Sequence, residues 1–168
     1  MVEPITREAF LARLRTARSA WDAALDRLGR SLLDRPGFCG PWSARDVIKH
    51  VAWYEQEMIN VLEARAFVSS PLWELSQKER NAAIHAIPTD LSSQALLRQE
   101  RLTYAHLLAL IESLQDTALN QPQFFPGMPA DWHPWQVFAS NTYEHYEDHL
   151  VHAEAFARVA QGTSSGAA

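Results

Sequence analysis

The sequence of 168 residues has one cysteine (Cys39), six glycines and no long apolar run. A single cysteine cannot form an internal disulfide, so the chain does not indicate an oxidising compartment. The few glycines form no phosphate-binding fingerprint, which argues against nucleotide binding of that kind. No window approaches the ~20 uninterrupted apolar residues of a membrane helix. The N-terminal segment MVEPITREAFLARLR has acidic residues and lacks the apolar centre of a signal peptide. We therefore expect a soluble, cytoplasmic protein without a membrane partner.

Positive charge is also scarce, because 15 Lys and Arg stand against 20 Asp and Glu, for a formal net charge of −5. This balance argues against a protein whose main task is to bind phosphate backbones, so nucleic acid is not an expected partner. Hydrophobic residues make up 47% and charged residues 21%, as in ordinary globular proteins. The length fits one domain, which we place at residues 1–161, followed by a small, polar and disordered tail at 162–168.

Four long segments show the apolar spacing of three and four residues that is typical of amphipathic helices. Ser43 is a good N-cap for the second of them, with Asp46 at the capping-box position. A polar segment at 71–88 separates the second helix from the third, and no sustained strand alternation is present. The sequence predicts an all-α four-helix bundle with a crossover segment between helices two and three. The helices are expected to begin near Thr6, Ser43, Ser92 and Pro134, the first ending at Pro36-Gly37 and the last near Ala160.

The inward face of the last predicted helix is apolar at both ends and carries histidines in the middle. Leu or Ile would be expected at these central positions if packing were their only role. His145 and His149 are one helical turn apart on the same face, a spacing that lets two imidazoles bind one metal ion. His50, at the edge of the apolar stripe of the second helix, could supply a third ligand. The face comprises Trp135, Phe138, Thr142, His145, His149, His152 and Phe156.

A purely structural role for these histidines is the alternative. Each of three partly buried imidazoles would then need its own hydrogen-bond partner, and helix backbones have few free carbonyls. A shared cation would satisfy two or three of them together, which favours the metal hypothesis without deciding it. His152 could be a fourth ligand, a supporting group or a residue of the apolar stripe.

Two segments resemble motifs of the DinB/YfiT-like superfamily. Residues 42–55 (WSARDVIKHVAWYE) are similar to its second-helix signature, and residues 141–149 (NTYEHYEDH) are similar to its closing His-x-x-x-His element. Members are four-helix bundles, often dimers, and many hold nickel, zinc or iron through one histidine of helix two and two of helix four. The resemblance implies that His50, His145 and His149 bind a divalent transition metal (Ni, Zn or Fe) and that the protein is a homodimer. The Arg80-Asn81 pair in the crossover and the closing motif look nearest the ClbS/DfsB-like branch.

This resemblance implies a metal-dependent hydrolase or thiol-dependent transferase that acts on a small electrophilic molecule, in detoxification or stress response. The ClbS/DfsB-like branch includes a self-protection protein that hydrolyses a reactive genotoxin, and other branches use low-molecular-weight thiols. Both reactions can start from one three-histidine site, because a bound metal activates either water or a thiol. The alternative is a non-catalytic stress-response or ligand-binding module without a functional metal. The sequence does not identify the substrate or the catalytic residues.

Other side chains are candidates for supporting roles. Glu57, Glu144 and Asp148 could orient ligands or move protons, although each also fits a solvated surface charge. Cys39 has no neighbouring histidine or basic cluster and is interpreted as structural. A set of aromatic residues could line an apolar pocket over the metal or could simply close one end of the bundle. This set comprises Trp53, Phe124, Phe125, Trp132 and Trp135.

Overall fold

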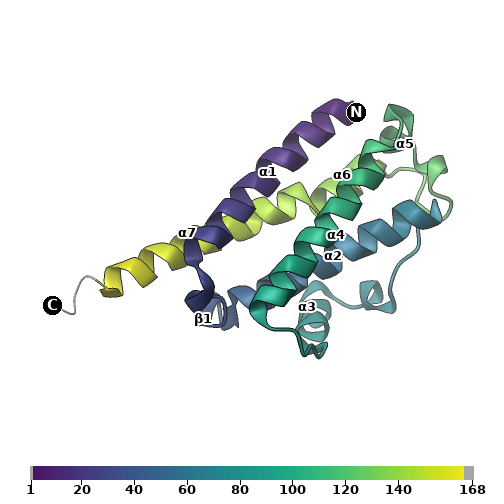
Figure 1. Cartoon of the computed structure of the whole chain (residues 1–168). Helices are drawn as coiled ribbons and strands as arrows, with labels where there is room; N and C mark the ends of the chain where they lie inside the picture. Colours follow the sequence, from purple (N-terminus) through teal and green to yellow (C-terminus); the bar gives the residue numbers. More distant parts are fainter. Residues whose placement is uncertain (1, 165–168) are drawn as a thin grey trace.

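The computed structural model describes residues 2–164, with side chains described as far as residue 160 (Figure 1). The predicted helical bundle is confirmed, with one small hairpin added to it. None of the described helices is both long and apolar enough to cross a membrane. The predicted tail begins at 162, but α7 extends to Ser164, and residues 165–168 lie outside the described part of the chain. The helices are α1 (Arg7–Leu28), α2 (Ala44–Ala64), α3 (Gln77–Ala86), α4 (Ser93–Glu112), α5 (Asp116–Asn120), α6 (Pro134–Ser140) and α7 (Tyr143–Ser164), with 3-10 turns η1 (Arg30–Leu32), η2 (Pro71–Glu74) and η3 (Pro122–Phe124).

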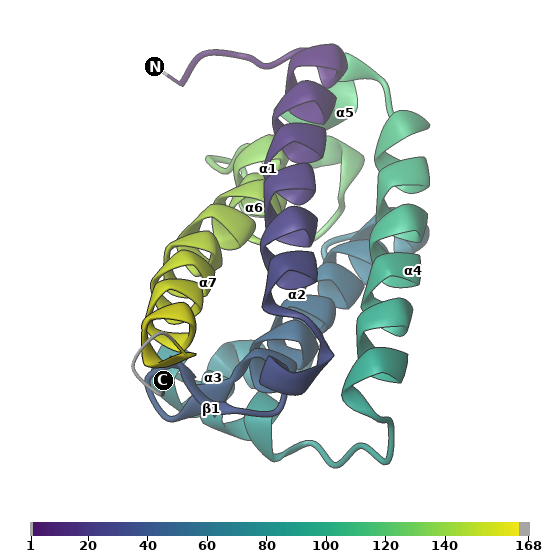
Figure 2. The same ribbon diagram turned by 60° about the vertical axis from the view of Figure 1, so that its left-hand side comes forward.

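The four long helices are arranged as two pairs, α1 with α7 and α2 with α4 (Figure 2). Within the second pair the helices run in the same direction. The Arg45 side chain at the start of α2 donates to the carbonyl of Leu91 just before α4, and the two C-terminal ends line one pocket. A parallel pair needs a long return connection, and the crossover segment with η2 and α3 provides it.

Local sequence signals explain where most of the long helices begin. Ser43 accepts a hydrogen bond from the backbone N–H of Asp46, and the Asp46 carboxylate accepts one from the N–H of Ser43, which confirms the predicted capping box. Thr6 and Ser92 cap α1 and α4 through their hydroxyls. The first helix ends earlier than predicted, at Leu28, because Gly29 takes a left-handed φ of 69° and stops the helical hydrogen bonding.

A two-stranded hairpin before α2 was not predicted. Strand β1 (Pro36–Cys39) pairs antiparallel with β2 (Trp42–Ser43). These strands are too short for the alternation of apolar and polar residues to reveal them. The hairpin buries Phe38 against Trp21 of α1 and Phe156 of α7, and it delivers Trp42 to the start of α2.

The last helix is broken where a continuous one was predicted. The Asn141 side-chain amide donates to the carbonyl of Val137 at 2.7 Å, and the Thr142 hydroxyl donates to that of Phe138 at 2.6 Å. Such side-chain bonds compete with the helical backbone bonds. The chain therefore turns between α6 and α7, immediately before the histidine motif begins.

Candidate metal centre

Three histidines meet where the two helix pairs join. The Nε2 atom of His145 lies 2.9 Å from that of His50 and 3.0 Å from that of His149. The candidate ligand atoms of all three lie within 4.8 Å of one another. His50 is 4% exposed and His149 is 9% exposed. Imidazole nitrogens around a tetrahedral zinc ion are about 3.3 Å apart, so this spacing is close to that of a metal site. The structure thus brings together the three predicted ligands.

The hydrogen-bonding capacity of the rings favours a shared cation. A neutral imidazole Nε2 carries either one hydrogen or one lone pair. The Nε2 atom of His145 faces two other Nε2 atoms and can make a well-directed hydrogen bond to only one of them. A cation at the centre would accept a lone pair from each of the three rings. The donor set therefore fits a divalent transition metal with nitrogen ligands.

The rings are already in the protonation state that metal binding requires. Burial, followed by repulsion from His149 and Arg80, lowers the pKa of His50 to about 3. Burial and then His152 lower the pKa of His149 to about 4. Burial, followed by the two neighbouring histidines, holds the pKa of His145 well below its usual range. All three imidazoles are therefore neutral near pH 7, and metal binding there would not have to displace protons.

Aromatic side chains hold the rings in place. The Nδ1 atoms of all three histidines are buried and have no hydrogen-bond partner in the part of the chain that the structure describes. The Trp42 ring packs edge-on against His50 at 5.5 Å between centroids, and the Tyr54 ring lies 4.8 Å from both His50 and His145. Trp42 and Tyr54 were not predicted as site residues, although both lie in the segment that resembles the second-helix motif.

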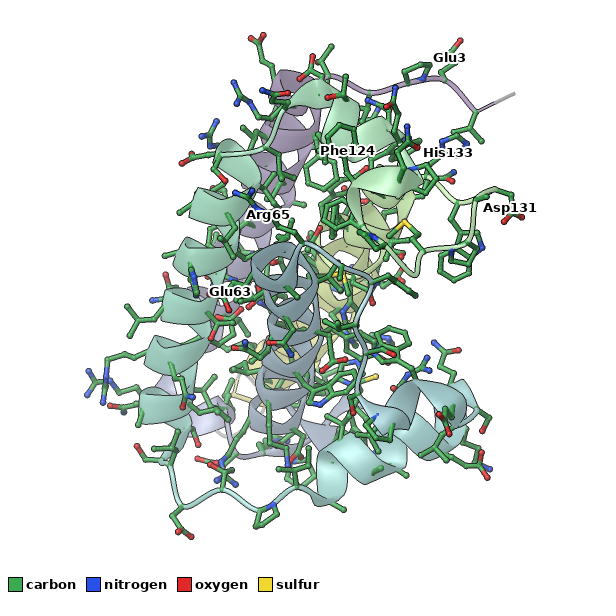
Figure 3. All side chains as sticks on the ribbon, turned by 90° about the vertical axis from the view of Figure 1, so that its right-hand side faces the viewer. Glu3, Glu63, Arg65, Phe124, Asp131 and His133 are labelled. Carbon is green, nitrogen blue, oxygen red and sulfur yellow. The ribbon has the colours of Figure 1, made fainter. Side chains whose placement is uncertain are left out.

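The five aromatic residues for which a mouth over the metal was one alternative do not gather at the histidines. Phe124 lies beyond the C-terminal end of α2, close to Arg65 (Figure 3), where Phe124 and Phe125 line a pocket with that residue. Trp132 packs on Phe67. Of these five residues, only Trp53 contacts the ring of Tyr54, at 4.9 Å, and so adjoins the histidines. Trp135 is half-buried on α6. The alternative in which all five line one mouth over the histidines is therefore wrong.

The candidate acidic residues also differ in their positions. Glu57 is buried, against the expectation of a surface charge, and accepts hydrogen bonds from the Ser70 N–H at 2.9 Å and from the Trp73 indole at 2.7 Å. It thereby anchors η2 to α2. Glu144 and Asp148 are exposed.

Two further residues singled out in the sequence lie outside the histidine cluster. His152 is exposed, with its ring 6.2 Å from that of His149. Cys39 is half-buried, and burial raises the pKa of its thiol, which fits the expected structural role.

The crossover segment brings polar groups to the site. The Arg80 Nε–H donates to the Tyr54 hydroxyl oxygen at 3.0 Å, and that hydroxyl donates to Asn81 Oδ1 at 3.1 Å. The Arg80 guanidinium also stacks over Trp73 at 4.4 Å from the ring centroid. A fixed positive charge and an oriented phenol thus lie beside the histidine rings.

An apolar pocket of about 320 Å³ opens next to this region. Trp73 forms part of its wall and contacts Tyr54, which in turn contacts two of the histidines. Asn141, four residues before His145 in the chain, lines another side. The pocket is lined by Met58, Val61, Phe67, Val68, Ser69, Trp73, Trp132, Val137, Ser140 and Asn141.

A buried charged cluster in the core was also missed in the sequence. Arg18, Glu55 and Glu100 are each 2% exposed or less. Their positions fall three or four residues from apolar members of the predicted stripes. Charged residues within an otherwise apolar stripe are the signal that could have revealed them.

Fold and site together define a helical bundle with a three-histidine cluster between its helix pairs, a class of protein suited to binding a transition metal. The model of the DinB superfamily matches residues 13–153, and the chain belongs to this superfamily.

Solved structures support the same fold, whereas none of the curated proteins matches the chain in sequence. A protein from Streptococcus pneumoniae superposes with a TM-score of 0.78 at 14% identity, covering 94% of this chain and 93% of that one. The colibactin self-resistance protein ClbS, solved with double-stranded DNA, gives 0.75 at 14% identity with coverage of 92% and 96%. The sibling lethal factor precursor DfsB gives 0.72 at 14% identity with coverage of 93% and 97%.

Proposed function

We propose that this protein is a metal-dependent enzyme that acts on a small electrophilic molecule, by hydrolysis or by transfer of a low-molecular-weight thiol. The convergence of the Nε2 atoms of His50, His145 and His149 carries this proposal. A divalent transition metal, when bound there, would turn a coordinated water or thiol into a nucleophile near neutral pH. Nickel, zinc and iron all suit imidazole ligands, and the donor set does not select among them.

The chain's own residues would bind and orient the substrate. The pocket next to Trp73 and Asn141 suits an apolar or aromatic portion of the molecule. Arg80 holds the Tyr54 hydroxyl in place, and its positive charge would stabilise negative charge that develops on the electrophile. Trp42 and Tyr54 pack around the histidines and limit the access of bulk water.

A detoxification or stress-response role is supported by the relatives. ClbS is a self-resistance protein by its own description. The same description places ClbS on double-stranded DNA, but this chain carries a net charge of −5, which argues against DNA as its partner. We propose a small molecule as substrate and a homodimer in the cytoplasm as the working form.

Metal analysis with two matched histidine variants tests the proposal. Untagged protein is purified without chelator and titrated with Co²⁺, alongside the His149→Ala and His152→Ala variants. We expect stoichiometric binding in the wild type and in His152→Ala, because His152 lies outside the cluster, and loss of binding in His149→Ala. Stoichiometric metal in His149→Ala would refute the assignment of the three ligands.

Activity is then measured on electrophilic probes such as an epoxide or a chlorodinitrobenzene, with and without added thiol. Turnover that disappears in His149→Ala supports the enzyme. A folded wild type that binds no metal even on titration, and turns over no probe, would instead identify a non-catalytic binding module.

A further inference from the structure

The candidate metal centre spans two helix pairs that pack sparsely against each other. His50 belongs to the α2/α4 pair, whereas His145 and His149 belong to the α1/α7 pair. Packing is extensive within each pair and much sparser between α2 and α7. The distance from His50 to the other two ligands therefore depends on what holds the two pairs in register.

A buried cluster of four side chains, one from each long helix, crosses this junction. Arg18 of α1 pairs with Glu100 of α4 through two hydrogen bonds, at 2.5 and 2.7 Å. The same guanidinium donates to Glu55 Oε1 of α2 at 3.1 Å, and the Tyr146 hydroxyl of α7 donates to that same oxygen. All four residues are 2% exposed or less. Each contact between Arg18, Tyr146 and the two carboxylates joins one helix pair to the other.

Glu55 and Tyr146 connect this cluster to the metal centre. Their hydrogen bond joins the two helices that carry the histidines. Tyr146 directly follows His145 in the chain. Glu55 directly follows Tyr54, whose ring contacts both His50 and His145. Glu55 also lies five residues beyond His50, about 7.5 Å along the helix axis.

We propose that Glu55 and Tyr146 are positioning residues for the metal centre: their buried hydrogen bond sets the spacing between His50 on α2 and the two histidines on α7. This inference rests on the proposed metal site. Buried polar groups often contribute little net stability but can specify one arrangement of helices over others. Loss of the bond would leave the helices folded and the three nitrogens poorly placed for one ion. Residues that orient metal ligands in this way typically change affinity by about 10- to 100-fold when replaced.

Two tyrosines whose rings pack against Arg18 supply a matched pair of variants. Tyr146→Phe removes the hydroxyl that bonds Glu55. The Tyr104 ring also packs on Arg18, with the guanidinium carbon 4.3 Å from the ring centroid. Its hydroxyl makes no hydrogen bond among residues 2–160, so Tyr104→Phe removes a hydroxyl without breaking a bond. In Co²⁺ titrations we expect the Kd of Tyr146→Phe to rise about 10-fold or more while that of Tyr104→Phe stays within about 2-fold of wild type. We also expect the visible absorption of bound Co²⁺ to change only in Tyr146→Phe.

A second variant breaks the same link from its other side. Glu55→Leu removes the acceptor but leaves the Arg18–Glu100 pair intact. We expect the same loss of Co²⁺ affinity as in Tyr146→Phe. A variant that fails to fold is identified by circular dichroism, and the other variant then decides.

The outcomes separate this inference from the proposed function. A wild type that binds no Co²⁺ overturns both. A wild type that binds Co²⁺, together with folded Tyr146→Phe and Glu55→Leu variants that match its affinity and its spectrum, overturns only the positioning role. A lowered melting temperature with unchanged affinity and spectrum assigns the cluster to stability alone and has the same consequence.

Discussion

The depressed pKa of His50 predicts a specific acid sensitivity of the metal-free protein. Its folded-state pKa is about 3, against an ordinary value of 6.5. The unfolded chain therefore takes up a proton at this residue as the pH falls through 6.5, whereas the folded chain stays unprotonated until about pH 3. The contribution of His50 to the free energy of unfolding is therefore complete above pH 6.5, and it is lost as the pH falls from 6.5 toward the folded-state pKa.

The size of the effect follows from how far the pH lies below the ordinary pKa of His50, as long as it stays above the folded-state pKa. A pH of 5 is about 1.5 units below the ordinary pKa of His50 and still above its folded-state pKa. At 1.36 kcal/mol per unit, His50 alone would remove about 2 kcal/mol from the free energy of unfolding between pH 7 and pH 5. Replacement of His50 by Gln, which does not titrate, should abolish this contribution while the other titrating groups remain in place.

Urea denaturation at pH 7 and pH 5, with a chelator present throughout, measures this difference. The wild type should lose about 2 kcal/mol more of its unfolding free energy than His50→Gln over this interval, whatever the absolute stability of each protein. Equal losses in the two proteins would refute the argument that His50 is buried as a neutral imidazole. A larger loss in His50→Gln would contradict the sign of the effect.

Three further predictions concern the scaffold. Arg18→Met leaves two buried carboxylates without their cation and should lower the unfolding free energy at pH 7 by about 3–5 kcal/mol, measured by urea denaturation; a loss below about 1 kcal/mol would contradict this. Ser43→Ala removes half of the capping box and should cost about 1 kcal/mol in the same assay, whereas an unchanged midpoint would show that the cap is dispensable. Glu57→Leu removes the acceptor for the Ser70 N–H and the Trp73 indole, so hydrogen exchange should accelerate at η2 and not in the middle of α4.

Most of the bundle could be predicted because helix formation depends on local signals. Spacing of apolar residues by three and four marked the long helices, and the Ser43 cap marked the start of α2 to the residue. Where prediction failed, the deciding interactions were short or non-local. The hairpin has strands of only four and two residues, and the break before α7 depends on side-chain bonds from Asn141 and Thr142.

The sequence by itself determined which residue types were available for a metal centre. The one-turn spacing of His145 and His149 places both on one face of any helix that contains them. Only the tertiary structure decided that His50 joins them, because α2 and α7 are separated in the chain by α3, α4, α5 and α6. The tertiary structure also decided that Trp42 and Tyr54, rather than the loop aromatics, surround the rings.

The burial of Arg18, Glu55 and Glu100 likewise depends on a junction of four helices. Each of these charges would be solvated on an isolated helix, and only their mutual pairing makes burial tolerable. Helical periodicity is a property of one segment, whereas the distance between two nitrogens on different helices is set by the packing of the whole bundle.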